Sequence, residues 1–411
     1  MFREIAKCYS SGAHDQRSQF KDIIYDSLES LRISVREEVL DMAYLVFNDG
    51  TTFEGTAFGD WLKSSPSVAE HEVVFNTSMS GYQEMVTDLS YAGQILVLTQ
   101  PQIGNYGWHH EENEADKTRL QGLIVRELSE GEGSLHSEGS LEDYCLRHSV
   151  RGLMGVDTRA LTRYLRQFGT LPGVMLENRD AALAYWANFQ AKHEIMEKGE
   201  HWVYRSTVKE AYEIPGPGPL LAVLDFGVKR NIIRNLQKRG FRIMVFPAGS
   251  AAEDILRHQP SGLVLSNGPG DPDDLPECVA TVRSLYDKLP VLGICLGHQL
   301  LALAAGGETY KLPYGHRGGN HPVIDVRSGK ATMTSQNHGY AVQEASLNGS
   351  GFAVTLRNLN DGTVEGMEHQ IYSILAVQFH PEGAPGPEEN SEIFDRFKKL
   401  VEKNLTRKGR S

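Results

Sequence analysis

The amino-acid sequence predicts an α/β protein whose second half is a mostly parallel sheet with helices on both faces, preceded by a mixed β/α domain. After residue 220, short apolar runs alternate regularly with helix-like segments, which is typical of parallel strands joined by crossover helices. Before residue 200, apolar β-branched runs alternate with turns and polar loops. Pro215-Gly-Pro-Gly-Pro219 lies between the two patterns and has the composition of a linker.

Composition and charge limit the class of protein. The chain has 411 residues, 40% of them hydrophobic, and no apolar run long enough to cross a membrane, so we expect a soluble protein of two or three domains. The net charge of -12 argues against nucleic acid as the main partner. The four cysteines are widely scattered and form no CxxC pair, which favours a reducing cytoplasm. The spacing of His and Cys predicts no metal site.

The changes in sequence pattern divide the chain into five segments. We predict an N-terminal extension of unknown role, a mixed β/α domain, a Pro/Gly linker, a sheet domain and a basic tail, in this order, at residues 1–41, 42–200, 201–219, 220–405 and 406–411.

Strands and helices follow from apolar periodicity and turn residues. In the first domain, Asn48-Asp-Gly50 predicts a hairpin turn, and Gly155-Val-Asp-Thr-Arg159 begins a helix capped by Asp157 or Thr158. Further strands of that domain are expected at 73–75, 95–99 and 120–125. In the second domain we expect strands at 220–224, 242–246, 262–265 and 289–294, and helices at 229–239, 252–258, 278–288 and 296–305.

One stretch of the second domain, Val291-Leu-Gly-Ile-Cys-Leu-Gly-His-Gln-Leu300, has the pattern of a nucleophile elbow built on sulfur. A buried strand ends, Cys295 follows at once, and a helix begins. Gly293 and Gly297 flank the cysteine and relieve the crowding of a sharp strand-to-helix turn. The helix amino terminus favours negative charge on the sulfur. Alone, the pattern is equally compatible with a buried structural cysteine.

A histidine and a carboxylate follow another apolar strand, in Ile374-Leu-Ala-Val-Gln-Phe-His-Pro-Glu382. In extended chain, the i, i+2 spacing of His380 and Glu382 sends both side chains to the same side. The carboxylate can then orient the imidazole while the imidazole takes the proton of a thiol. Cys295 needs such a base because a free thiol is mostly protonated at pH 7. By itself, a His-x-Glu pair is more typical of a protein surface.

Two polar loops complete the predicted site. Leu265-Ser-Asn-Gly-Pro-Gly-Asp-Pro272 follows a buried strand, and open α/β sheets bind ligands at the carboxyl ends of their strands. A backbone N–H of this loop, with that of Leu296, could form an oxyanion hole; the alternative is an ordinary turn. Ser335-Gln-Asn-His-Gly-Tyr340 offers amide and backbone groups that suit an α-amino, α-carboxyl ligand.

These motifs resemble those of known families. Residues from about 220 to 403 are similar to class I (triad-type) glutamine amidotransferases, through Gly293-Ile-Cys-Leu-Gly-His-Gln299 and Gln378-Phe-His-Pro-Glu382. The front half resembles the small, glutaminase subunits of carbamoyl phosphate synthetases. That second resemblance is carried by Phe75-Asn-Thr-Ser-Met-Ser-Gly-Tyr-Gln-Glu84, Gln102-Ile-Gly-Asn105, Gly155-Val-Asp-Thr-Arg159 and Asp225-Phe-Gly-Val-Lys-Arg-Asn231.

The resemblance implies a role for each matching residue. Cys295 would be the nucleophile, His380 the base and then the acid, and Glu382 the carboxylate that orients the histidine. The family usually has phenylalanine where Tyr340 stands, and often a second histidine at Arg317, to which we assign no role. L-Glutamine would be bound by residues of both domains, namely Ser78, Gly268, Gly270, Leu296, Gln299, Asn337, Gly339 and Tyr340.

The resemblance also implies a partner. Ammonia would pass to a large synthetase subunit that makes carbamoyl phosphate from bicarbonate and ATP, for pyrimidine and arginine biosynthesis in the cytoplasm. ATP and magnesium are expected only on that subunit, because this chain has no G-x-x-x-x-G-K-[ST] loop; we expect no cofactor here. The alternatives are a glutaminase subunit of another amidotransferase, a catalytically silent regulatory relative, or a thiol hydrolase with another substrate.

Overall fold

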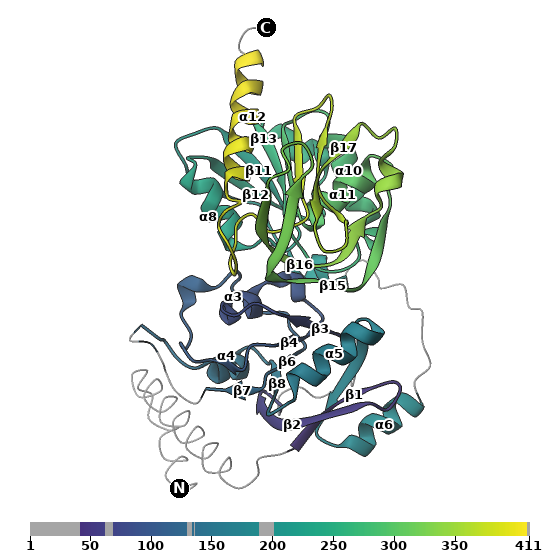
Figure 1. Ribbon diagram of the computed structural model, residues 1–411. Coiled ribbons are helices and arrows are strands. Elements are labelled where there is room, and N and C mark those ends of the chain that lie inside the picture. The colour runs from purple at the N-terminus through teal and green to yellow at the C-terminus, as the bar shows by residue number, and fades with distance from the viewer. Residues whose placement is uncertain (1–41, 62–68, 130–133, 135, 189–200, 409–411) are drawn as a thin grey trace, which may run out of the picture. The chain divides into compact units, whose positions relative to one another are not determined.

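Two large sheets organise the residues that the computed structural model describes, which are 42–61, 69–129, 134, 136–188 and 201–408 (Figure 1). The predicted extension 1–41 lies outside these residues, as do the last three residues of the predicted tail. The chain from Ala43 onward forms one compact unit. Its first large sheet is a closed barrel, and its second is a ten-stranded sheet.

The barrel has the strand order β1-β2-β8-β6-β4-β3-β9. Leu45 and Phe47, like Val73 and Phe75, lie two residues apart on one strand, so each pair faces the same way and packs in one buried cluster with helix α5. Val74 faces the opposite way, into a cluster shared with α3 and α4. The strands are β1 Met42–Phe47, β2 Thr52–Gly59, β3 His71–Asn76, β4 Ile95–Leu98, β6 Gly122–Ile124, β8 Arg151–Met154 and β9 Leu171–Leu176.

The remaining elements of the first domain surround this barrel. The hairpin predicted at Asn48-Asp-Gly50 is confirmed, with the Gly50 amide donating to the Phe47 carbonyl at 3.0 Å. Asp157 caps α5, since its carboxylate accepts from the amide of Ala160 at 2.9 Å. The elements are α3 Tyr82–Thr87, η1 Leu89–Tyr91, β5 Gln102–Ile103, η2 His110–Glu112, β7 Glu127–Leu128, α4 Leu141–Arg147, α5 Thr158–Phe168 and α6 Arg179–Ala187.

The second sheet has the strand order β10-β12-β11-β13-β14-β19-β18-β17-β15-β16. The strands from β12 to β19 in this order pair in parallel, as the alternating sequence pattern predicts, and antiparallel strands flank them on both sides. The strands are β10 Tyr212–Ile214, β11 Leu220–Asp225, β12 Arg242–Pro247, β13 Gly262–Leu265, β14 Val291–Ile294, β15 Thr309–Asp325, β16 Ala331–Val342, β17 Phe352–Asn358, β18 Val364–His369 and β19 Ile374–Val377.

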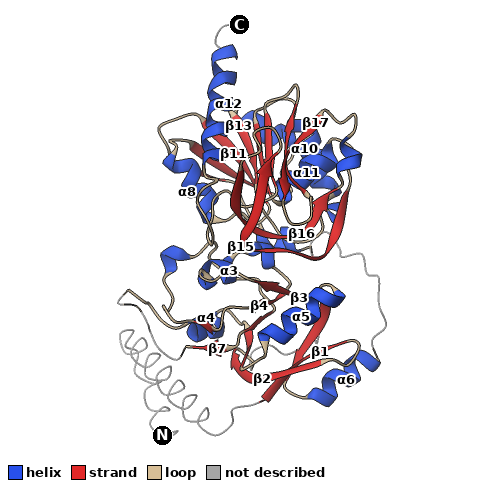
Figure 2. Ribbon diagram, in the orientation of Figure 1, coloured by secondary structure: helices blue, strands red, loops and turns tan. Residues whose placement is uncertain are grey.

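Helices cover both faces of the parallel strands, as predicted (Figure 2). Ala222 and Leu224 of β11 pack in one core with α9, α10 and α11, while Leu221 and Val223 pack in another with α8 and α12. Both faces of these strands are therefore apolar, which explains their continuous apolar runs. The helices are α7 Trp202–Ser206, α8 Arg230–Lys238, α9 Ala252–Arg257, η3 Pro272–Asp274, α10 Pro276–Leu285, α11 Leu296–Ala304, η4 Glu344–Leu347 and α12 Glu392–Lys408.

The segment predicted as a linker, 201–219, is more structured than its Pro/Gly run suggests. Strand β10 lies within it and pairs with β12, with Tyr212 opposite Val245. Val203 of α7 is fully buried in the core of the second domain. The prolines and glycines at 215–219 end β10, but the residues before them carry enough apolar side chains to join the second domain.

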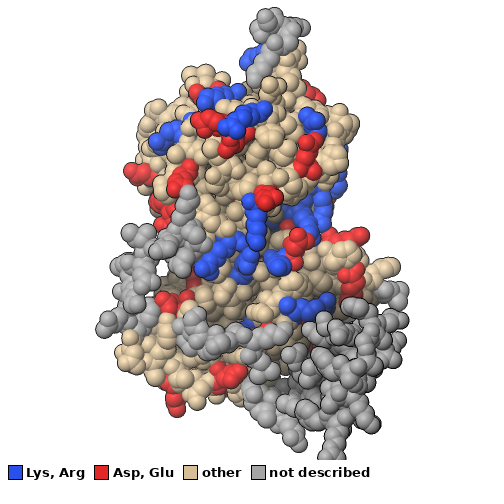
Figure 3. Space-filling model, turned by 180° about the vertical axis from the view of Figure 1, so that it is seen from behind, with Lys and Arg blue, Asp and Glu red and all other residues tan. Residues whose placement is uncertain are grey.

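The surface carries charges of both signs. On the face that Figure 3 shows, Lys and Arg side chains gather across the middle of the molecule with a few Asp and Glu side chains among them, and charges of both signs lie elsewhere on this face. Among the described residues, no helix combines the length and the apolar character needed to span a bilayer.

Candidate active site

Cys295 lies in a sharp turn between β14 and α11, as the nucleophile-elbow pattern predicts. Its backbone has φ 54° and ψ -105°, a conformation that costs energy for a residue with a side chain. A Cβ atom at Gly293 would come within 2.6 Å of Leu301, and one at Gly297 within 2.3 Å of the Leu265 carbonyl oxygen. Glycine is therefore required on both sides of the cysteine for the helix to pack against the sheet.

Pairing of β14 with β19 brings the histidine to the cysteine. The strands are parallel with Ile294 opposite Val377, so the segments that follow them leave the same sheet edge. The Cys295 amide donates to the Val377 carbonyl at 2.9 Å. The His380 side chain interacts with the Cys295 side chain. On its other side, His380 Nδ1 lies 2.6 Å from Glu382 Oε1.

The three predicted catalytic residues are thus adjacent and fully enclosed. Cys295, His380 and Glu382 are each at most 2% exposed. Nε2 of His380 makes no well-aligned hydrogen bond to any described residue, which leaves it available to a thiol or a leaving group. Such contacts often tighten only when substrate binds.

The surrounding charges determine the protonation states of His380 and Glu382. Burial lowers the pKa of His380, but the Glu382 carboxylate outweighs it and the net effect raises that pKa to about 10. Burial raises the pKa of Glu382, and the positive charges of Lys229 and His380 reverse this and lower it to about 2. At neutral pH the pair is therefore imidazolium and carboxylate. An imidazolium at His380 places a positive charge beside the Cys295 side chain.

The variant Glu382→Gln should lose this charge balance. With the carboxylate gone, burial and the Lys229 charge both act to lower the pKa of His380, so its imidazolium should disappear near neutral pH. NMR titration of the labelled His380 ring measures this directly. We expect kcat for glutamine hydrolysis to fall about 10²–10⁴-fold. The exposed Glu389→Gln is the matched control, and a His380 ring that stays protonated at pH 8 in Glu382→Gln would contradict the argument.

Lys229 is a member of this array that sequence reasoning missed. Its side chain is 2% exposed, its Nζ lies 3.0 Å from Glu382 Oε1, and it donates to the Gly383 carbonyl at 2.9 Å. Glu382 thus shares one oxygen between a histidine and a lysine. The signal that could have revealed it is the motif Asp225-Phe-Gly-Val-Lys-Arg-Asn231, in which a lysine stands just after a buried strand.

The structure brings several predicted glutamine-binding residues to the cysteine. The carbonyl oxygen of Asn337 lies 3.6 Å from Cys295 Sγ. Gln299 donates through Nε2 to the carbonyl of Tyr340 at 2.8 Å. A Cβ atom at Gly268 would lie 2.8 Å from the Leu296 side chain, so the loop after β13 packs directly against the start of α11. This placement agrees with an oxyanion hole between that loop and the first helical amide.

Tyr340 contacts the loop that contains Gly270. The Tyr340 hydroxyl forms a side-chain hydrogen bond with Asp271, which follows Gly270. Burial and the nearby Asp271 carboxylate raise the pKa of Tyr340, so the phenol stays neutral. Tyrosine is therefore tolerated here because its hydroxyl has a partner. Gly339 lies beside the Arg317 side chain: a Cβ atom at Gly339 would be 3.4 Å from a guanidinium nitrogen of Arg317.

The first domain reaches the site through two segments. Asp88, just before η1, accepts a hydrogen bond from Asn337 Nδ2 at 2.9 Å. The amide of Thr77 donates to the carbonyl of Arg317 at 3.4 Å, which places the neighbouring Ser78 against β15. The Ser78 hydroxyl is buried and has no hydrogen-bond partner among the described residues. An unpaired buried hydroxyl beside the second domain, which holds Cys295, is suited to binding a polar group of the substrate.

Comparisons with known proteins agree with both halves of this description. Residues 45–175 match the family model described as the CPSase domain of the carbamoyl-phosphate synthase small chain. Residues 222–400 match the model for class-I glutamine amidotransferases. The two matched ranges lie within the two domains inferred from the sequence, in the same order.

Curated relatives match along most of the chain. A carbamoyl phosphate synthase small chain from Symbiobacterium thermophilum is 48% identical over 364 residues, covering 87% of this chain and 98% of the relative. Those from Bacillus caldolyticus and Clostridium acetobutylicum are 44% and 45% identical, covering 89% and 87% of this chain and 98% and 99% of their own lengths. The chain therefore belongs to the carbamoyl phosphate synthase small chain family.

Proposed function

We propose that this chain hydrolyses L-glutamine through a thioester on Cys295 and supplies the ammonia to a large synthetase subunit. The observation that carries the proposal is the buried contact of Cys295, His380 and Glu382 at one sheet edge. A sulfur nucleophile, an imidazolium and an orienting carboxylate form a set of groups that is suited to cleavage of an unactivated amide.

The reaction follows from the positions of these groups. The Cys295 thiolate attacks the side-chain amide carbon of glutamine, and the carbonyl oxygen becomes an oxyanion. Backbone N–H groups of Leu296 and of the loop at Gly268 stabilise that charge. His380 gives its proton to the leaving nitrogen, ammonia departs, and a γ-glutamyl thioester remains. His380 then takes a proton from water, which attacks the thioester and releases glutamate and the thiolate.

The names of the relatives support a partner for this chain. The relatives are named small chains, which supports a larger synthetase subunit as the partner of this chain. That subunit would combine ammonia with bicarbonate and ATP to form carbamoyl phosphate, and would hold the ATP and magnesium itself. The heterodimer would act in the cytoplasm for pyrimidine and arginine biosynthesis. A channel between the subunits would keep ammonia from escaping to solvent.

The test measures both halves of the proposal. Glutamate release from glutamine is assayed for the chain alone and with a large carbamoyl phosphate synthase subunit, together with carbamoyl phosphate formation in the second case. We expect one carbamoyl phosphate for each glutamate released by the complex. Glutamate release without carbamoyl phosphate would leave the chain a glutaminase but refute the proposed partner, and no glutamate release in either case would refute the amidase itself.

The variant Ser78→Ala tests whether the first domain contacts glutamine. If the unpaired Ser78 hydroxyl binds a charged group of the substrate, its loss should raise KM for glutamine roughly tenfold or more, with a smaller change in kcat. Steady-state kinetics of glutamate release measure this. Ser80→Ala is the control, because Ser80 is exposed two residues away. An unchanged KM in Ser78→Ala would show that this hydroxyl does not bind substrate.

A further inference from the structure

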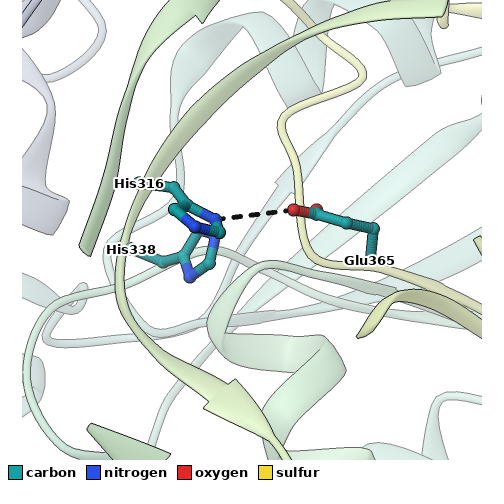
Figure 4. Close-up of side chains that lie close together, drawn as sticks. All are labelled: His316, His338 and Glu365. Carbon is teal, nitrogen blue, oxygen red and sulfur yellow. Dashed lines mark ion pairs between the residues drawn. The ribbon is translucent and has the colours of Figure 1, made fainter. Parts of the chain in front are cut away.

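A second cluster of buried side chains lies outside the triad. His316 of β15, His338 of β16 and Glu365 of β18 are at most 6% exposed, and each can offer one ligand atom such that all three atoms lie within 4.8 Å of one another. The two histidines are directly opposite each other in the β15–β16 pair. The two rings are nearly perpendicular, with centroids 4.9 Å apart, and Figure 4 shows the Glu365 carboxylate pointing toward them.

Hydrogen bonds fix which ring nitrogen of each histidine faces the cluster. Nδ1 of His338 lies 2.7 Å from the Tyr340 carbonyl and must donate to it, so Nε2 carries the lone pair. That Nε2 is buried and has no hydrogen-bond partner within the described residues. Nε2 of His316 lies 2.8 Å from Asp361 Oδ2, which leaves Nδ1 facing Glu365 Oε1 at 3.6 Å and the Asn358 amide nitrogen at 3.5 Å. Histidines that bind metals are held in this way by a carbonyl or carboxylate on the far nitrogen.

The central distance suits two ligands of one ion better than a hydrogen bond. Nδ1 of His316 and Oε1 of Glu365 are 3.6 Å apart, longer than a normal N–H···O bond. With metal–ligand bonds of about 2.0–2.2 Å at tetrahedral angles, two ligand atoms lie about 3.3–3.6 Å apart. The three ligand atoms of the cluster lie within 4.8 Å of one another. To bind one ion, the two most distant of them would have to approach each other by about 1 Å.

The charge of the Glu365 carboxylate also favours a cation here. Glu365 is fully buried, and its two oxygens accept from Asn358 and Gln336, both at 2.8 Å, which are neutral amides. Among the ion pairs of the described residues, its sole cationic partner is His316. A buried carboxylate without a strong cation is costly, and so is a buried imidazole lone pair without a donor.

We propose that His316, His338 and Glu365 bind one divalent transition metal ion of the zinc class. Two imidazoles and a carboxylate are ligands that such ions prefer, and the three side chains leave a fourth position for water. The sequence predicted no metal site because the ligands come from three strands and have no recognisable spacing. The ion would join β15, β16 and β18 directly behind Asn337 and Gly339, so its role would be to stiffen the strand that presents them.

Cobalt(II) is the probe, because a four-coordinate site gives it a visible absorption that the aqueous ion lacks. The full chain is used as Cys295→Ser, since a catalytic thiol next to a histidine could itself bind the metal. After treatment with a chelator, the protein is titrated with cobalt, and bound cobalt is counted by elemental analysis. We expect one cobalt per chain, a four-coordinate spectrum without a thiolate charge-transfer band, displacement by zinc, and a higher melting temperature with metal.

Three variants in the same background locate the site. Glu365→Gln keeps the shape of the side chain but removes the anionic ligand, so the four-coordinate spectrum should be lost. Asp361→Asn leaves all three ligands in place and removes only the carboxylate behind His316, and should weaken cobalt binding about 10–100-fold. His258→Asn changes an exposed histidine outside the cluster and should bind cobalt as the parent does.

The results separate this site from a simple ion pair. The parent and Asp361→Asn decide the matter even if Glu365→Gln does not fold. A folded parent chain that binds no cobalt, with the His316 ring protonated at neutral pH by NMR, would overturn the proposal in favour of an imidazolium between two carboxylates. Equal cobalt binding by the parent and Asp361→Asn would overturn it too, since the metal would then lie elsewhere.

Discussion

Replacing Cys295 by serine should abolish glutamate release from glutamine while leaving glutamine binding intact. Serine is close to cysteine in size, so the elbow between β14 and α11 should be preserved. The hydroxyl, however, is far harder to deprotonate than a thiol, and the imidazolium of His380 cannot act as its base. We expect kcat to fall by about 10⁴-fold or more. A coupled assay for glutamate and calorimetric titration with glutamine measure the two effects separately.

A second buried cysteine provides the control for this variant. Cys278 lies in α10, with its Sγ 3.7 Å from the Tyr204 hydroxyl and 3.5 Å from the Ala248 carbonyl. A serine at that position has polar partners in reach, so Cys278→Ser should fold and hydrolyse glutamine normally. If Cys295→Ser turned over glutamine at an ordinary rate, the thioester mechanism would be wrong. If Cys278→Ser lost activity as well, the effect of Cys295→Ser could not be assigned to the nucleophile.

The fold could be predicted where local pattern and tertiary environment agree. β11, β13 and β14 are buried on both faces, so each reads as a continuous apolar run and was predicted within one or two residues. Strand β10 was missed because it is only three residues long, Tyr212–Ile214, and lies beside a run of prolines and glycines. Its pairing with β12, rather than any local preference, makes it a strand.

The adjacency of Cys295, His380 and Glu382 could be predicted in part because each of these residues lies in a segment with a local signature. The glycines around Cys295 mark a sharp turn, and the spacing of His380 and Glu382 places both side chains on one side of the chain. That the two motifs meet depends on β14 pairing with β19, whose register no local pattern encodes. The family resemblance supplied this long-range information. Neither source predicted the cluster around Glu365, because its residues are each ordinary where they stand.

Replacing Lys229 by methionine should both destabilise the protein and impair hydrolysis. The ammonium is buried, and burial would lower the pKa of Lys229, but the carboxylates of Glu382, Asp88 and Glu114 outweigh it and raise that pKa, so the charge is retained. Removing one partner from a buried ion pair leaves the other charge uncompensated and typically costs about 3–5 kcal/mol. We expect a loss of that size in the free energy of unfolding, measured by urea denaturation.

The loss of Lys229 should reach catalysis through Glu382. Without the ammonium, His380 is the one cationic partner of Glu382 Oε1 that remains among the described residues, and burial acts to raise the pKa of Glu382. The carboxylate should shift, and His380 with it, and a misplacement of about 1 Å can cost about 10²-fold in rate. Lys238→Met, at an exposed position on the same helix, is the matched control. A Lys229→Met protein as stable and as active as Lys238→Met would show that the buried lysine neither compensates Glu382 nor holds the triad in place.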